Sequence, residues 1–92
     1  MKRTIKFRTD INTRGCGFGA YKQVSDTRWY LDTIAIANEH NVVISKIKIY
    51  DWLSDKTSKV TIKYDSEEQW KTFAMHFLAH FACYMKDIKV NI

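Results

Sequence analysis

Cationic side chains alternate with apolar ones in residues 3–11, 42–52 and 59–65, and one more lysine follows near the C-terminus. The cations that share this spacing are Lys6, Arg8, Lys46, Lys48, Lys59, Lys63 and Lys89. Alternate side chains of a β-strand point to the same face of a sheet, so these seven are expected to share one face. Ammonium and guanidinium groups neutralise phosphates, and the pattern therefore favours binding of RNA or single-stranded DNA.

Two aromatic residues and a glycine-rich segment accompany these cations. Tyr50 and Trp52 close the second cationic segment, where they could stack on unpaired bases. Residues 12–19 hold all three glycines, and Arg14 and Lys22 make this stretch a candidate phosphate-contacting loop.

The absence of acidic residues among the outward positions of 46–50 and 59–63 gives the cationic face its functional interest. Neighbouring lysines on one face repel one another unless something anionic lies there. The alternative is a solvated face whose lysines confer solubility and protect strand edges.

A second group of chemically competent residues lies near the C-terminus. His76, His80 and Cys83 fall at i, i+4 and i+7, so one edge of a helix would present all three, a spacing compatible with Zn²⁺. A fourth ligand is missing, and only a coincidence of folding would bring His40 to them. Packing at the border of an aromatic stripe is the competing interpretation, and no metal site or cofactor is predicted.

Acidic residues suggest one catalytic alternative. Asp10 and Asp51, each near the end of a predicted strand, resemble the metal-holding carboxylates of ribonuclease H-like nucleases. The helix between them should then offer a glutamate, but Tyr30 or Asp32 occupies that region. We therefore expect a protein that is not an enzyme.

A different functional class would use the helix near the C-terminus. Met75, Ala79 and Ala82 lie opposite its aromatic stripe and would form an exposed apolar seam. The alternative function is thus a protein-binding inhibitor or adaptor, similar to phage accessory proteins, that docks on an acidic host partner or forms a homodimer.

The size and composition of the chain limit the domain count, the kind of partner and the location that these hypotheses can assume. The chain has 92 residues and a net charge of +5, which predicts one domain over 1–92 and anionic partners. No apolar run is long enough for a signal peptide or a membrane span, and two cysteines are too few for a disulfide framework. A cytoplasmic protein without a membrane partner is expected.

The elements that must position these residues can be assigned by periodicity. Strands are expected over 3–11, 42–52, 59–65 and 88–92, with Ser54–Thr57 as the turn of a hairpin. A short extra strand is expected after the glycine-rich turn. Helices are expected over 28–40, with Tyr30, Ile34 and Ala37 on one stripe and Asn41 at the end, and from Ser66 to Lys86.

The second helix has the strongest local signals. Ser66 to Gln69 form a capping-box pattern with carboxylates in the first turn. The apolar stripe that follows comprises Trp70, Phe73, Ala74, Phe77, Phe81 and Tyr84.

The order of these elements predicts an α+β fold. Without the extra hairpin strand it resembles the ferredoxin-like split βαββαβ topology, a mostly antiparallel sheet with two helices on one face. The opposite face would be open and basic. The sequence thus favours a small binding module that engages RNA or single-stranded DNA through that face.

Overall fold

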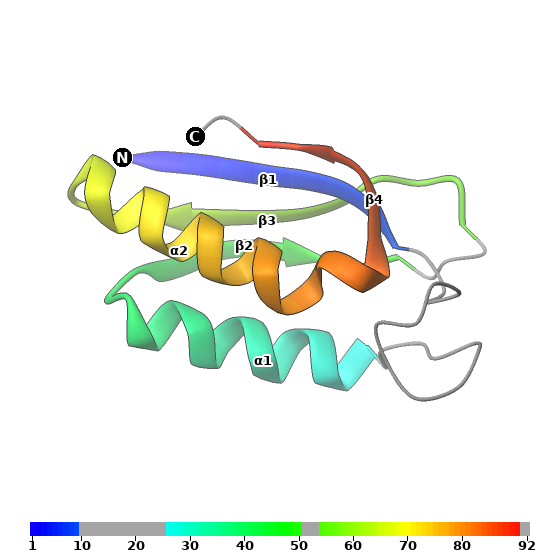
Figure 1. Cartoon of the computed structure of the whole chain (residues 1–92), viewed down its shortest axis with the longest axis horizontal. Coiled ribbons are helices and arrows are strands. Elements are labelled where there is room, and N and C mark those ends of the chain that lie inside the picture. The colour runs from blue at the N-terminus through cyan, green and yellow to red at the C-terminus, as the bar shows by residue number, and fades with distance from the viewer. Residues whose placement is uncertain (10–25, 51–53, 91–92) are drawn as a thin grey trace.

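The computed structural model describes residues 1–9, 26–50 and 54–90. Four strands and two α-helices alternate along the chain in the order βαββαβ (Figure 1). Their bounds are β1 Lys2–Thr9, α1 Asp26–Glu39, β2 Val43–Lys48, β3 Ser58–Lys63, α2 Glu67–Phe81 and β4 Met85–Lys89, with a 3₁₀ turn, η1, over Ala82–Tyr84. The glycine-rich turn, the extra strand, Asp10 and Asp51 lie outside the described residues.

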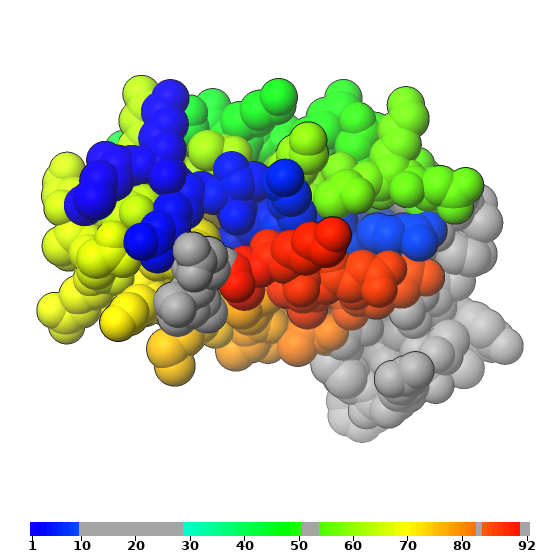
Figure 2. All heavy atoms as spheres, turned by 90° about the horizontal axis from the view of Figure 1, so that it is seen from above, coloured from blue at the N-terminus to red at the C-terminus, as the bar shows by residue number. Residues whose placement is uncertain are grey.

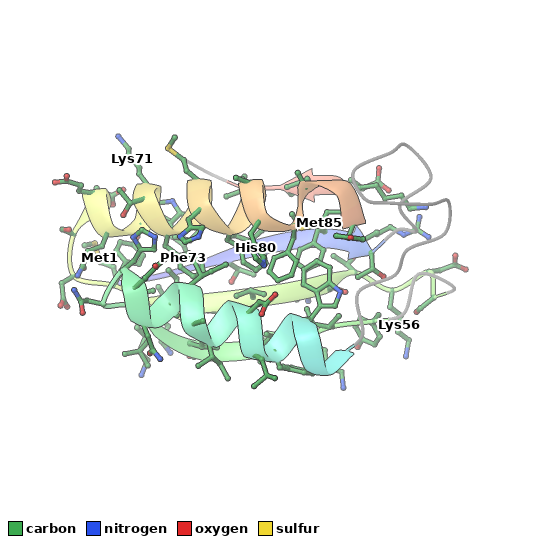
Figure 3. The ribbon with its side chains drawn as sticks, turned by 60° about the horizontal axis from the view of Figure 1, so that its bottom comes forward. Met1, Lys56, Lys71, Phe73, His80 and Met85 are labelled. Atoms are coloured by element: carbon green, nitrogen blue, oxygen red, sulfur yellow. The ribbon has the colours of Figure 1, made fainter. Side chains whose placement is uncertain are left out.

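The sheet confirms the predicted ferredoxin-like topology. Its strands lie in the order β2-β3-β1-β4, and every neighbouring pair is antiparallel. Both helices lie on the same side of the sheet and cover one face of it (Figures 1 and 3). The other face carries the alternate side chains of the same strands.

Helix α2 begins where its capping box predicts. The hydroxyl of Ser66 accepts the Gln69 backbone N–H at 3.3 Å, and the Gln69 side chain accepts the Ser66 N–H at 3.2 Å. Trp70, Phe73 and Phe77 are fully buried against the sheet. The local signals therefore fix both the start of α2 and its apolar face.

The predicted end of α2 at Lys86 is wrong. The helix ends at Phe81, the η1 turn follows, and β4 begins at Met85, three residues before the predicted start of the last strand. Tyr84 still packs partly against the core, but from η1. Met85 and Lys86 pair with β1, so their backbone N–H and C=O groups serve the sheet and cannot also extend the helix.

Helix α1 is present, but its buried stripe is displaced from the predicted one. Ile34 is 47% exposed and Tyr30 is only half-buried, whereas Trp29, Thr33 and Ile36 are buried. Ala37 is buried as expected. The Thr33 hydroxyl donates to the Trp29 carbonyl at 2.6 Å, which lets a polar residue occupy the core side of the helix.

Asn41 ends α1 as predicted, through a Schellman motif. Its φ of 57° lies in the left-handed region, which asparagine tolerates better than most residues. The Val42 N–H donates to the Ala37 carbonyl at 3.0 Å, and the Asn41 N–H donates to the Asn38 carbonyl at 3.3 Å. These bonds also fix the backbone of His40, the residue just before Asn41.

The core lies between the helices and the covered face of the sheet and is rich in aromatic rings. Trp29 of α1 stacks on Phe81 of α2 with ring centroids 3.9 Å apart and on Phe7 of β1 at 5.3 Å. Phe73 points from α2 into the same layer (Figure 3). Within the described ranges, neither helix has the length and apolar character needed to cross a membrane.

Candidate anion-binding face

Four lysines form one row across the open face of the sheet, one from each strand. Lys48 of β2 lies opposite Lys59 of β3, Lys59 lies opposite Lys6 of β1, and Lys6 lies opposite Lys89 of β4. Residues directly opposite in an antiparallel pair have Cα atoms about 4.5–5.5 Å apart and point to the same face. We call Lys48, Lys59, Lys6 and Lys89 the lysine row.

A bulge in edge strand β2 places its lysines in this arrangement. Ile44 pairs with Ile62 of β3, but Lys46, not Ser45, pairs with the next residue, Thr61. The extra residue shifts the alternation by one, so that Lys46 and Lys48 face outward. If the same sequence paired regularly, with Ser45 opposite Thr61, both lysines would point toward the helices.

The other edge strand, β4, contains a second bulge with the same effect. Arg8 pairs with Lys86, and two residues earlier in β1 Lys6 pairs with Lys89, so β4 has one residue more than β1 over this stretch. Asp87, with a φ of 51°, lies in the bulge. A regular β4 would have placed Ile88 opposite Lys6, and the bulge puts Lys89 there instead.

Further cations flank the row on the same face. Lys63 lies opposite Lys2, and Lys46 lies opposite Thr61, whose hydroxyl shares a hydrogen bond of 2.7 Å with that of Thr4. The lysines of the row are exposed, as are Lys2, Lys46 and Lys63. Viewed from above, β1, β4 and parts of β2 and β3 lie at the surface with no helix over them (Figure 2).

Acidic groups approach this face only at its rim, as far as the described residues go. Arg8 pairs with Asp55 at 3.3 Å and with Asp87 at 3.8 Å. Among the described residues, Lys6, Lys46, Lys59, Lys63 and Lys89 form no ion pair. The Arg8 Nε is buried without a hydrogen-bond partner in the described part of the chain. Within the described ranges, the cationic charge at the centre of the face is therefore uncompensated.

Tyr50 is held at one end of the face by two side chains of the neighbouring strands. Its backbone N–H donates to the Ser58 hydroxyl at 2.8 Å, and its carbonyl accepts the Thr9 hydroxyl at 2.6 Å. The ammonium groups of Lys48 and Lys56 lie 5.6 and 5.4 Å from the centre of its ring, within cation–π range. Tyr50 is thus an integral part of the basic surface.

Two hollows cover the open face and meet at Thr57 and Lys59. One is lined by Lys6, Arg8, Thr57, Lys59, Asp87, Ile88 and Lys89. The other is lined by Lys46, Lys48, Tyr50, Asp55, Lys56, Thr57 and Lys59. Both hollows are bordered by the lysine row, so a bound anionic chain could follow the row from one to the other.

The structure brings together the described part of the predicted site. Lys6, Arg8, Lys46, Lys48, Tyr50, Lys59, Lys63 and Lys89 all lie on or at the end of the open face. Arg14, Lys22 and Trp52 lie outside the described residues. Sequence reasoning missed Lys2, which pairs with Lys63, and Lys56, which reaches Tyr50 from the hairpin loop. Strict alternation from Lys6 would have indicated Lys2.

The apolar seam of the alternative hypothesis lies on α2 and the first residue of η1. Met75 is 63% exposed, and Ala79 and Ala82 are exposed as well. One large apolar residue followed by two alanines is a small patch for a stable interface. Comparisons with protein-family models, with curated proteins and with solved structures find no match for this chain.

Proposed function

We propose that this chain is a non-enzymatic module that binds RNA or single-stranded DNA across the open face of its sheet, chiefly through phosphates. The observation that carries the proposal is the lysine row. A solubilising surface needs cations, but it does not need them aligned over four strands by a bulge at each edge.

The electrostatics of the row favour an anionic ligand. Two unit charges about 6 Å apart in water repel by about 0.7 kcal/mol, and the row contains three neighbouring pairs. Phosphates placed between the ammonium groups would replace this repulsion with attraction and release counterions. With strands about 4.8 Å apart, the row extends about 14 Å, enough to follow an extended nucleic-acid backbone.

The side chains of the central strands favour phosphate contacts over base recognition. The outward residues of β1 and β3 are Lys2, Thr4, Lys6, Arg8, Lys59, Thr61 and Lys63. Open-sheet RNA binders stack bases on aromatic residues at such positions, and the described parts of these two strands offer none. We therefore expect binding with weak sequence preference and a strong dependence on salt.

Fluorescence anisotropy with labelled oligo-U and oligo-dT of about 12 nucleotides, titrated between about 50 and 200 mM salt, tests the proposal. Lys6→Ala should reduce the slope of log K against log salt by about 0.7, and Lys6→Ala with Lys59→Ala by about 1.4. Lys71→Ala is the matched control, because it removes the same charge from the helix layer (Figure 3).

Four outcomes separate the hypotheses. Equal losses in Lys6→Ala and Lys71→Ala would mean that net charge, and not the face, governs binding. Absence of binding to either oligonucleotide refutes the proposal. Capture of an acidic protein that survives nuclease treatment but fails with Lys6→Ala would assign the face to protein recognition, whereas failure with Met75→Glu alone would indicate the α2 seam.

A further inference from the structure

A second group of functional side chains lies in a groove between the two helices, on the opposite side of the molecule from the lysine row. The groove is lined by Asp32, Ala35, Ile36, Glu39, His76 and His80. His80 of α2 pairs with Asp32 of α1 at 2.9 Å, and one turn away His76 approaches Glu39 at 3.2 Å. Both histidines therefore face carboxylates of α1, but their surroundings differ.

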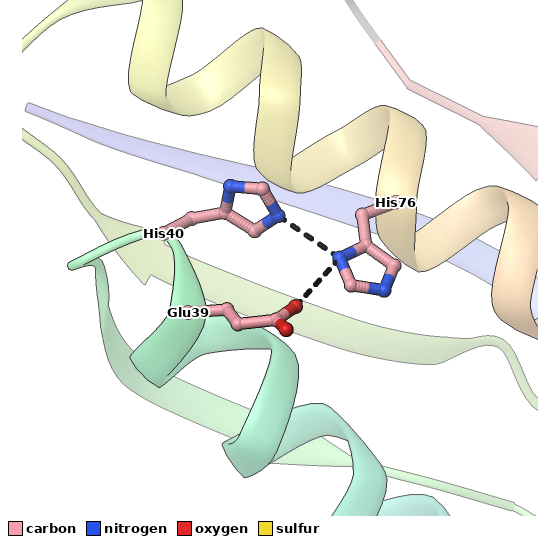
Figure 4. A group of neighbouring side chains, drawn as sticks. All are labelled: Glu39, His40 and His76. Atoms are coloured by element: carbon pink, nitrogen blue, oxygen red, sulfur yellow. Dashed lines mark hydrogen bonds and ion pairs between the residues drawn. The ribbon is translucent and has the colours of Figure 1, made fainter.

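Of these two histidines, His76 alone has another imidazole nitrogen within hydrogen-bond distance among the described residues. His40 Nε2 lies 3.0 Å from His76 Nδ1, the same nitrogen that approaches Glu39 Oε2 (Figure 4). One ligand atom from each of the three residues lies within 4.8 Å of the other two. We call Glu39, His40 and His76 the imidazole cluster.

A single proton does not satisfy this arrangement. If His76 Nδ1 carries the proton, it can donate to the Glu39 carboxylate, and His40 Nε2 then faces an N–H that is already used. If Nδ1 carries its lone pair, it can accept from His40, and the carboxylate then faces a lone pair. A cation bonded to all three atoms would satisfy them together.

The spacing of the cluster fits a small tetrahedral metal ion. Zinc bonds to nitrogen and oxygen of about 2.0–2.1 Å at tetrahedral angles place neighbouring ligand atoms about 3.3 Å apart. The two separations that involve His76 Nδ1, 3.0 and 3.2 Å, are close to that value, and the third pair of ligand atoms lies within 4.8 Å. Two imidazoles and one carboxylate suit zinc far better than calcium or magnesium, which prefer oxygen ligands.

We propose that Glu39, His40 and His76 form a Zn²⁺ site that links the C-terminal end of α1 to the middle of α2, with water completing the coordination. Local structure prepares the site. The Schellman motif at Asn41 fixes the backbone of His40, and Glu39 is the last residue of α1. Half-exposure of the His76 side chain leaves the ion a path from solvent.

Zinc titration of the untagged chain, followed by calorimetry, tests this site. We expect the chain to bind one equivalent of Zn²⁺, and no more, at saturation. His40→Ala and His76→Ala should each weaken the affinity by about tenfold or more, and His80→Ala should change it by less than about twofold. His80→Ala is the matched control, because it removes an imidazole from the same groove but outside the cluster.

A thermal shift provides an independent readout that also reports folding. Saturating zinc should raise the unfolding midpoint of the wild-type chain by about 5 °C or more and leave that of folded His76→Ala unchanged. Absence of saturable zinc binding by the wild-type chain refutes the site. Losses in His80→Ala or Cys83→Ser as large as that in His40→Ala would also overturn it, in favour of ligands spaced along α2 and η1.

Discussion

On the covered face of the sheet, Ile5, Phe7 and Val60 are fully buried, while the residues that alternate with them on the open face, Lys6 and Lys59, are exposed cations. The same strands thus present one surface that stabilises the fold and another whose like charges repel one another. Burial of apolar area explains the first surface. The second surface is the one for which we propose an anionic ligand.

The largest expected effect tests the covered face. Phe77→Ala removes a fully buried ring that contacts Phe73, Phe81 and Phe7, with centroids 5.1 to 5.9 Å away. We expect a loss of about 3–5 kcal/mol in the free energy of unfolding, measured by urea denaturation.

Met75→Ala is the matched control for that substitution. Met75 lies on the same helix but is 63% exposed, so its truncation should change stability by less than about 0.5 kcal/mol. A large loss in Met75→Ala, or a stability that depends on protein concentration, would instead show that the apolar seam is buried between copies of the chain.

An intermediate effect is expected where the two faces meet. Ser58 is fully buried, and its hydroxyl accepts the backbone N–H of Tyr50. Ser58→Ala should cost about 1–3 kcal/mol, because the Tyr50 N–H loses its partner. It should also weaken oligonucleotide binding by displacing Tyr50, whereas Thr57→Ala, at the exposed neighbour, should leave stability unchanged. Equal stability of the two variants would contradict the assigned role of Ser58.

The smallest expected effect is a gain in folding stability, where the preceding substitutions lose it. Lys59 has a like charge on each side of it in the row, so Lys59→Gln should stabilise the fold by about 0.5–1 kcal/mol at low salt, and by less at high salt. Binding of oligonucleotides should weaken in the same variant. Lys71→Gln, on the helix layer, should change neither property. A destabilised Lys59→Gln would mean that the row is not under electrostatic strain.

Elements defined by local chemistry could be predicted from the sequence, whereas the register of the strands and the packing of the helices could not. The capping box at Ser66 and the Schellman position of Asn41 each depend on a few consecutive residues. The stripe of α1 was misassigned because apolar residues fill two adjacent stripes, and the buried one includes Thr33, whose hydroxyl is satisfied within the helix.

The candidate sites show the same division. Alternation predicted which lysines face outward, but the row depends on the register of β2 and β4 against their neighbours. His40 and His76 are 36 positions apart, and only the packing of α1 against α2 brings their rings together. The spacing of His76 and His80 indicated a helix edge with ligand character, without showing that each faces a different carboxylate.

The bulges in β2 and β4 bear on how such a chain can vary. Exchanging one exposed lysine for another polar residue changes one charge and leaves its neighbours in place. Losing the extra residue of either bulge would leave a regular strand in which the remaining residues keep their facing. Pairing the present sequence without a bulge would instead reverse the facing of the residues beyond it, bringing lysines toward the aromatic core and apolar side chains into water. The facing of the edge-strand residues therefore depends on the bulges being kept as bulges, and not on composition alone.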